Sequence, residues 1–245
     1  MQNLVEVKNL KKSYGLKEAV KGISFKIKDD EILGLLGPNG SGKTTTIGMM
    51  LGLLKPSSGE IIIDGKKIED NRIEILKKIN FISPYIELPK KLTVNQNLIV
   101  YGKLYSVSDI KQRIEYLSEK LRLGDLLNKI TGELSSGQKN RVSLAKALIN
   151  KPKVLLLDEP TASLDPEIGD FVRTFLEDYK KEMKISILLA SHNMNEVTRL
   201  CRSTLMMKDG IIIDSGTPNE LISKHGRQNL EEVFLKLTRE KNEFN

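Results

Sequence analysis

Eight consecutive residues have the types and spacing of a phosphate-binding loop: Gly37-Pro38-Asn39-Gly40-Ser41-Gly42-Lys43-Thr44. Glycines let the backbone turn its N–H groups toward phosphate oxygens, and the start of the following helix adds the positive end of its dipole. Lys43 supplies a movable cation, and Thr44 offers a hydroxyl to magnesium. An ordinary glycine turn is the alternative, but a chance match has odds of only about one in a hundred. Nucleotide binding is therefore predicted.

Two adjacent carboxylates, Asp158 and Glu159, follow the apolar run Val154-Leu155-Leu156-Leu157. In an open parallel sheet, ligands bind at the carboxyl ends of the strands. Because side chains alternate along a strand, the two acids cannot do the same job if strand geometry persists. Asp158 is predicted as an outer or water-mediated magnesium ligand, and Glu159 as the group that polarises water for attack on a terminal phosphate. In isolation, an Asp-Glu pair ending a strand is more often plain surface.

A second cluster of small polar residues, Leu134-Ser135-Ser136-Gly137-Gln138, precedes an amphipathic helix. Its hydroxyls and glycine could cap that helix or hold an anion at its start. On spacing alone, capping is the better interpretation.

The elements that position these residues follow from hydrophobic patterning. Residues 3–8, 22–28 and 60–64 alternate as half-buried antiparallel strands do, whereas 32–36 is apolar throughout, as in a strand buried on both faces. A helix is predicted over 44–54, stopped by Pro56.

Residues 84–152 change to helical spacing with no β-rich run, which predicts a helical subdomain. Strands at 154–157 and 185–190, separated by a helix over 168–181, imply a parallel crossover. Near the end, Thr217, Pro218 and Glu220 predict a helix start with a capping box. The last helix carries a packing stripe of Leu230, Val233, Phe234 and Leu237.

The composition is that of a folded protein able to bury a core without disulfides: 245 residues, 39% hydrophobic, with a net charge of +7. No apolar run approaches the roughly 18 residues of a membrane span, and no secretory signal is visible. The single cysteine, Cys201, favours a reducing cytosol. The charge admits nucleic acid, an anionic membrane or phosphate ligands, but the basic residues are scattered and select none of them.

The order of these motifs resembles the ATP-binding cassette (ABC) ATPases: phosphate loop, helical insertion ending in Leu-Ser-Ser-Gly-Gln, Leu-Leu-Leu-Asp-Glu-Pro-Thr, Ala162-Ser163-Leu164-Asp165 and Ser191-His192. The resemblance implies an α/β fold: a P-loop NTPase core with a parallel sheet flanked by helices, an N-terminal antiparallel β subdomain and an inserted helical subdomain. It implies one ABC ATPase domain over 1–220, with 84–152 inserted, and a C-terminal helical extension over 221–245.

The resemblance also implies which residues act on ATP and Mg²⁺. Glu159, His192 and Lys43 would be catalytic, with His192 contacting the terminal phosphate, and Thr44 and Asp158 would hold the metal. Tyr14 would stack on adenine, although a lone exposed tyrosine is the plain alternative. Ser135 and Gly137 would touch the terminal phosphate held by another cassette, and Asp165 would lie at the seam of that head-to-tail dimer. The nucleotide-binding set is Tyr14, Gly37, Pro38, Asn39, Gly40, Ser41, Gly42, Lys43, Thr44, Thr45, Ser135, Gly137, Gln138 and Asp165.

Two positions depart from the family pattern. Ser136 replaces the commoner glycine. Pro84 stands where the family usually has a glutamine that senses magnesium and the attacking water, and proline offers no donor or acceptor on its side chain. Either Tyr85 or Gln96 takes the place of that glutamine, or the sensing of magnesium and the attacking water at this position is weakened.

The leading prediction is an ATPase subunit of a membrane transporter, of the export type, whose pore lies on separate transmembrane permease subunits. It would work at the cytoplasmic face of the membrane, paired with a second cassette that is a copy or a relative, without direct contact to nucleic acid. A soluble cassette ATPase acting on DNA or the ribosome is the main alternative, supported only by the net charge. A small-molecule P-loop kinase would leave Leu-Ser-Ser-Gly-Gln without a role.

Overall fold

The computed structural model describes residues 3–84 and 86–240, which belong to two compact units. The first unit is formed by Met1–Ile75 and Ser186–Asn245, and the second by Leu76–Ile185. None of the helices in the described part of the chain has the length and apolar character of a membrane span.

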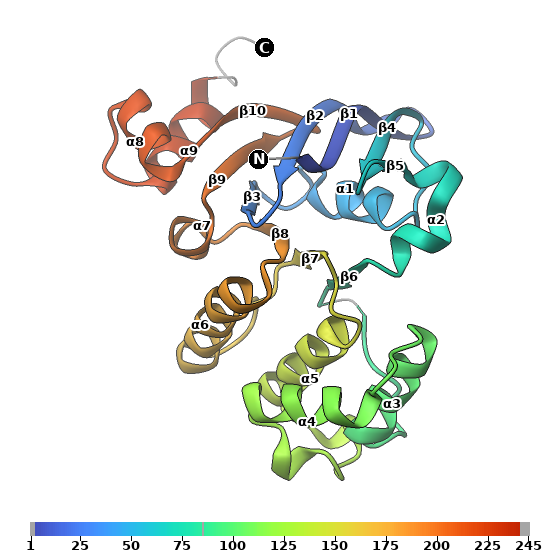
Figure 1. The fold of residues 1–245 in the computed structure, drawn as a ribbon. Coiled ribbons are helices and arrows are strands. Elements are labelled where there is room, and N and C mark those ends of the chain that lie inside the picture. Colours follow the sequence, from blue (N-terminus) through green and yellow to red (C-terminus); the bar gives the residue numbers. More distant parts are fainter. Residues whose placement is uncertain (1–2, 85, 241–245) are drawn as a thin grey trace. The chain divides into compact units, whose positions relative to one another are not determined.

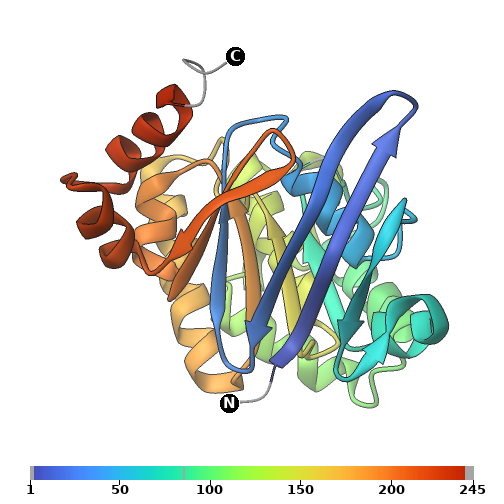
Figure 2. The same ribbon diagram turned by 90° about the horizontal axis from the view of Figure 1, so that it is seen from above.

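The first unit contains an antiparallel sheet in the order β2-β1-β4-β5, dominated by the long β1–β2 hairpin (Figure 2). Its strands are β1 (Asn3–Tyr14), β2 (Lys17–Lys28), β4 (Ser58–Ile63) and β5 (Lys66–Lys67). Alternation sets its two faces, because Ile23, Phe25 and Ile27 are buried while the residues between them are exposed. The register places Val5 opposite Ile63, so the apolar sides of neighbouring strands coincide. The predicted antiparallel strands are confirmed, and the first two are longer than predicted.

A second sheet in this unit carries the strand that leads into the phosphate loop. β3 (Ile32–Leu36) is buried at every position and pairs in parallel with both β8 (Ser186–Ser191) and β9 (Ser203–Lys208). β9 pairs antiparallel with β10 (Ile211–Gly216). A strand enclosed on both edges and both faces is a rigid base for the loop that follows it.

The helix after the phosphate loop is shorter than predicted. α1 (Lys43–Met50) ends before Gly52, which adopts φ 63°, and the amides of Leu53 and Leu54 both bond to the Gly48 carbonyl oxygen. The left-handed glycine closes the helix, so the prediction that it continues to residue 54 and stops at Pro56 is wrong.

The C-terminal helices of the first unit lie beside its second sheet (Figures 1 and 2). They are α7 (Met194–Leu200), α8 (Pro218–His225) and α9 (Leu230–Glu240). The predicted capping box is confirmed: Thr217 Oγ1 accepts from Glu220 N, and Glu220 Oε2 accepts from Thr217 N at 2.8 Å. In α9, Leu230, Val233 and Phe234 are buried. Residues 241–245 of the predicted extension lie outside the described residues.

The second unit combines two parallel strands with helices (Figure 1). The strands are β6 (Ile79–Ile82) and β7 (Val154–Asp158), and the helices are α3 (Val94–Leu104), α4 (Ile110–Lys120), α5 (Ser136–Leu148) and α6 (Pro166–Met183). α2 (Ile68–Leu76) comes before β6. Two short 3₁₀ turns, Gly124–Leu126 and Thr131–Glu133, join α4 to α5. Within 86–152 the structure shows helices and turns with one isolated bridge, Thr93 to Ile130, as the helical spacing predicted.

Candidate nucleotide site

The phosphate loop connects β3 directly to α1 within the first unit, as its sequence predicted. Gly37 is buried and follows the last residue of β3, while residues 38–40 are exposed. Gly42 occupies the N-cap position of α1 with φ 106°, and no side chain caps this end. The N–H groups of the first turn therefore lack a capping side chain, which leaves this positive helix end available to an anion.

Two glycines of the loop cannot be replaced without moving the backbone. A Cβ added to Gly37 would lie 2.2 Å from the carbonyl oxygen of Met207, and one added to Gly42 would lie 2.6 Å from that of Ala19. The left-handed φ of Gly42 further excludes other residues. The loop is therefore fitted tightly between β2 and β9.

Two polar side chains of the loop are buried. Lys43 is 5% exposed, and its Nζ donates to the carbonyl oxygens of Gly37 at 2.6 Å and Pro38 at 3.2 Å. Ser41 is 3% exposed, and its Oγ has no hydrogen-bond partner among the described residues. A buried hydroxyl without a partner costs free energy, and a phosphate oxygen would satisfy it. Thr44, by contrast, is exposed.

His192 lies in the same unit, immediately after β8, and is exposed. β8 is the parallel neighbour of β3, and the amide of Gly37 donates to the carbonyl oxygen of Ser191 at 3.3 Å. The first residue of the phosphate loop is therefore joined to the residue next to His192. Both strands deliver their carboxyl ends to one edge, where an α/β sheet binds ligands.

The paired carboxylates lie in the second unit at the end of β7. Asp158 is the last residue of the strand and is 1% exposed. Glu159 leaves the strand with φ 52°, an uncommon conformation for a residue other than glycine. Strand alternation therefore does not persist through the pair. The left-handed turn at Glu159, rather than alternation, gives the two acids different surroundings.

The serine-rich cluster of the second unit forms the start of α5. Ser135 is the N-cap: its Oγ accepts from Gln138 N at 3.3 Å, and Gln138 Oε1 accepts from Ser135 N at 3.0 Å. The capping interpretation is confirmed. Ser135 is exposed, whereas Gly137 is buried against Ile168.

Asp165 also has a local role in the structure. It is the N-cap of α6, where its Oδ1 accepts from the amide of Ile168 at 3.0 Å, and Pro166 opens the helix. Its side chain remains exposed, so a second contact is sterically open.

Tyr14 is the last residue of β1 and is 48% exposed. The ammonium of Lys12 lies 5.1 Å from its ring centroid. A cation over the ring is one way in which an exposed tyrosine is stabilised.

The structure shows that Gln96, one of the two residues that could replace the family's glutamine at position 84, is engaged elsewhere. Gln96 belongs to the capping box of α3, where its Oε1 accepts from Thr93 N at 2.9 Å and its own amide donates to Thr93 Oγ1. Its side-chain oxygen is committed to that helix end. Tyr85 lies outside the described residues, and Pro84 is exposed after β6.

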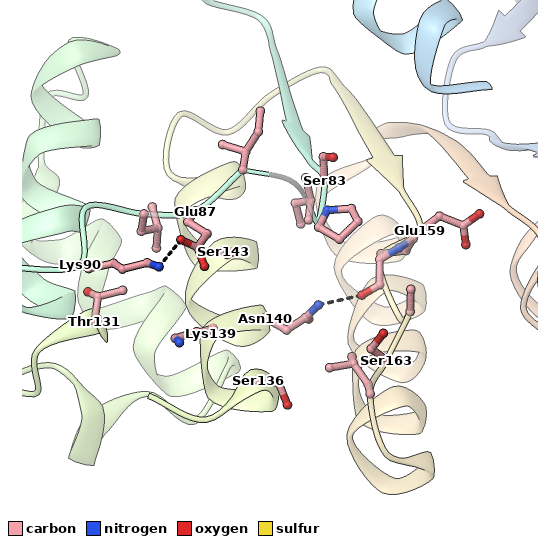
Figure 3. A pocket seen from close by; sticks show the side chains of 17 residues that line it. Ser83, Glu87, Lys90, Thr131, Ser136, Lys139, Asn140, Ser143, Glu159 and Ser163 are labelled. Atoms are coloured by element: carbon pink, nitrogen blue, oxygen red, sulfur yellow. Dashed lines mark hydrogen bonds and ion pairs between the residues drawn. The ribbon is translucent and has the colours of Figure 1, made fainter. Parts of the chain in front are cut away.

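A cavity of about 210 Å³ lies within the second unit, and its lining includes Pro84, Ser136 and Glu159 (Figure 3). Figure 3 shows Ser136, Lys139 and Asn140 of α5 on one side and Glu159 with Ser163 on the other. The amide nitrogen of Asn140 donates to the carbonyl oxygen of Pro160 at 2.7 Å, which fastens α5 to the turn after Glu159. Lys90 and Glu87 also line the cavity, and they form an ion pair at 2.6 Å.

Two buried charged residues near these motifs were not identified from the sequence. Glu196 is 1% exposed in α7, and its spacing of three from the N-cap Asn193 is a capping pattern that could have been noticed. Lys146 is 8% exposed in α5 and donates to the carbonyl oxygen of Phe81 at 3.2 Å. Nothing in the sequence distinguishes Lys146 from an exposed lysine of a helix.

Comparison with known proteins assigns this fold and set of motifs to a family. A profile described as "ABC transporter" matches residues 20–162. The Nod factor export ATP-binding protein I of Paraburkholderia xenovorans (strain LB400) is 37% identical over 232 residues, covering 94% of this chain and 76% of that protein. The chain belongs to the ABC transporter family.

Solved structures agree with this assignment. An ATP-binding subunit of an ABC transporter superposes with a TM-score of 0.88 at 27% identity, covering 96% of this chain and 99% of the other. An ATP-binding cassette solved as a dimer in a post-hydrolysis state with ADP and Pi gives 0.80 at 28% identity, covering 87% and 98%. The chain has the fold of an ABC ATPase cassette, and the predicted fold class is confirmed.

Proposed function

We propose that this chain hydrolyses ATP to power export through transmembrane permease subunits carried on separate chains. The observation that supports it most directly is the phosphate loop, in which buried Lys43 and Ser41 line a glycine cradle at the start of α1. Support for the direction of transport comes from the export protein that shares 37% identity over most of both chains.

The phosphate loop is proposed to bind the nucleotide through backbone amides and Lys43. When a phosphate arrives, the Lys43 ammonium exchanges the carbonyl oxygens of Gly37 and Pro38 for phosphate oxygens. The exchange is favoured because the phosphate oxygens carry negative charge, so both partners of the new hydrogen bonds are ionised, whereas the carbonyl oxygens are neutral. Ser41 Oγ gains the partner that it lacks among the described residues. Tyr14, exposed at the end of β1, is proposed to stack on the adenine.

Thr44 and Asp158 fit a magnesium ion in the chemistry of their donors. Mg²⁺ prefers oxygen ligands and is usually held by one or two protein groups together with substrate phosphates. Thr44 contributes an exposed hydroxyl at the first turn of α1, and Asp158 contributes a buried carboxylate at the end of β7. When bound, the ion would neutralise charge on the phosphate oxygens.

Glu159 is proposed to accept a proton from the attacking water. The water oxygen forms a bond to the terminal phosphorus, the bond from that phosphorus to the ADP oxygen breaks, and ADP, phosphate and a proton are released. The turn at Glu159 presents its carboxylate beyond the strand end, and His192 is proposed to contact the terminal phosphate from the turn after β8. General base catalysis of this kind contributes about 10²- to 10⁴-fold.

A second cassette, either another copy or a relative, is proposed to supply Ser135, Gly137, Gln138 and Asp165 to the nucleotide of its partner. A solved relative is a dimer with ADP and Pi, which supports this arrangement. Ser135 and Asp165 are exposed N-cap residues on the same unit, so both helix starts are reachable by a partner chain.

Permease subunits on separate chains are proposed to hold the chain at the cytoplasmic face of the membrane, a proposal supported by the similarity to the ATP-binding protein of an export system. Direct binding of nucleic acid is not part of the proposal. The surface offers paired lysines among acids and few aromatic side chains, in contrast to a stacking platform.

Co-purification tests the transporter assignment. Tagged Glu159→Gln protein, which should hold ATP without turning it over, is captured with ATP from gently solubilised cells, and co-purifying chains are identified by mass spectrometry. Lys43→Ala is the control because it should lose the ATP-dependent complex. A stoichiometric multi-span membrane protein is the expected result, and ribosomal proteins or DNA in its place would overturn the proposal.

A further inference from the structure

Ser191 connects the phosphate loop to the turn that carries His192. It is fully buried at the end of β8, and it lies opposite Leu36 in the parallel register with β3. Its carbonyl oxygen accepts from the amide of Gly37 at 3.3 Å. Any movement of Ser191 therefore shifts the first residue of the loop and the backbone of His192 together.

The hydroxyl of Ser191 takes part in two further hydrogen bonds. It donates to Glu196 Oε2 at 2.7 Å and accepts from the amide of Asn193 at 3.0 Å. The side-chain oxygen of Asn193 in turn accepts from the amide of Glu196 at 3.2 Å. These three bonds enclose His192, because they fix the residues on both sides of it to the first turn of α7.

Helix capping alone does not account for Glu196. In a capping box, an acid three residues after the N-cap accepts from the N-cap amide. Here the amide of Asn193 donates to Ser191 Oγ instead, and the Asn193 side chain caps α7. Glu196 is 1% exposed, and burial of a carboxyl group costs free energy that an apolar residue would avoid. The carboxylate is bonded to Ser191 rather than to the helix end, which points to a role for the turn between them.

We propose that Glu196 is a positioning residue for His192, acting through the hydroxyl of Ser191 to hold the backbone on both sides of the histidine beside the phosphate loop. This inference rests on the proposed function, in which His192 contacts the terminal phosphate. Glu196 itself touches no substrate. Its effect is on the geometry of the imidazole, and small displacements of catalytic groups are costly.

Substitutions at Glu196 separate positioning from folding. Glu196→Ala removes the acceptor of the Ser191 hydroxyl, and we expect kcat to fall about 10- to 100-fold, as misplaced catalytic groups do. The Kd for ATP should stay within about twofold, because the bond from the Gly37 amide to the Ser191 carbonyl oxygen does not use the hydroxyl and still anchors the phosphate loop. Glu196→Gln keeps an acceptor and should restore kcat to within about threefold of the wild type.

Val197→Ala is the matched control, since Val197 is the next residue of α7 and its apolar side chain is fully buried. It destabilises the same helix and should leave kcat unchanged at equal folded fraction. If Val197→Ala lowers kcat as much as Glu196→Ala does, the proposal is wrong. Should Glu196→Ala not fold, Ser191→Ala deletes the connecting hydroxyl and carries the same expectation.

A double-mutant cycle with His192→Ala gives the decisive readout. If Glu196 acts through the histidine, adding Glu196→Ala to His192→Ala should cause no further loss of kcat. Independent losses that multiply would overturn the inference. In parallel, hydrogen exchange of the Asn193 amide should accelerate in Glu196→Ala and not in Glu196→Gln. This second readout needs no turnover, so inactivity of the wild-type protein would count against the proposed function alone.

Discussion

The ammonium nitrogen of Lys43 lies 2.6 Å from the carbonyl oxygen of Gly37, at the other end of the same loop. The loop therefore holds its cation inside a cradle of backbone atoms, where Lys43 is 5% exposed. A phosphate group must compete with those carbonyl oxygens, and it can do so because it is charged.

Lys43→Ala should lower the affinity for ATP about 10- to 100-fold, the range lost with one charged hydrogen-bonding group. Titration with a fluorescent ATP analogue measures this change. Lys26→Ala, which removes the same charge from an exposed position on β2, is the control and should bind normally. An unchanged Kd in Lys43→Ala would refute the assignment of the phosphate loop.

Glu159→Gln should keep ATP binding and lose turnover by about 10²-fold or more, because the amide cannot accept the proton of the attacking water. Single-turnover hydrolysis and ATP titration on the same sample separate the two effects. Glu167→Gln, an exposed acid in the first turn of α6, is the matched control. Normal hydrolysis by Glu159→Gln would exclude Glu159 as the base.

Local patterns of the sequence were sufficient to predict several of these features. The phosphate loop, the helix cap at Ser135 and the capping box at Thr217 depend on residues within a few positions of one another, so their spacing is visible in the chain. The fully buried β3 was predicted for the same reason, since an unbroken apolar run requires cover on both faces.

Features that depend on backbone conformation or distant partners could not be predicted in this way. The end of α1 depends on the left-handed conformation of Gly52. The turn at Glu159 depends on a φ of 52°, which the sequence pattern around this residue does not predict. The bond from Gly37 to Ser191 joins strands far apart in sequence, so the surroundings of His192 emerge only from the parallel register.

Pro84→Gln tests whether the family's usual glutamine has a substitute here. Pro84 is exposed and lies two residues beyond the end of β6, so the change should leave the melting temperature nearly unaltered. The side-chain oxygen of Gln96 is engaged by its capping box, so Gln96 does not compete with the restored amide. We expect kcat to rise, measured by phosphate release. Pro89→Gln, an exposed proline of the same loop, is the control, and an equal rate in Pro84→Gln and wild type would indicate that another group already acts there.

The buried Lys146 makes stability depend on pH in the alkaline range. Burial disfavours the ammonium and lowers the pKa of Lys146 from 10.5 to about 8, although its Nζ lies over the rings of Phe81 at 4.8 Å and Tyr101 at 5.5 Å. Between these two pH values the unfolded chain holds a proton that the folded chain has released. Unfolding then takes up a proton, so this residue makes the free energy of unfolding rise with pH.

We therefore expect the stability of the wild type relative to Lys146→Met to increase between pH 8 and pH 10.5 by up to about 3 kcal/mol, which is the free energy equivalent to that difference in pKa. Urea unfolding of both proteins at several pH values measures it. Lys111→Met, at an exposed position of α4, should show no such trend. A difference between wild type and Lys146→Met that stays constant from pH 8 to pH 10.5 would mean that the Lys146 amine keeps its ordinary pKa in the folded chain. In that case the hydrogen bond to Phe81 and the two aromatic rings would stabilise the ammonium enough to offset its burial.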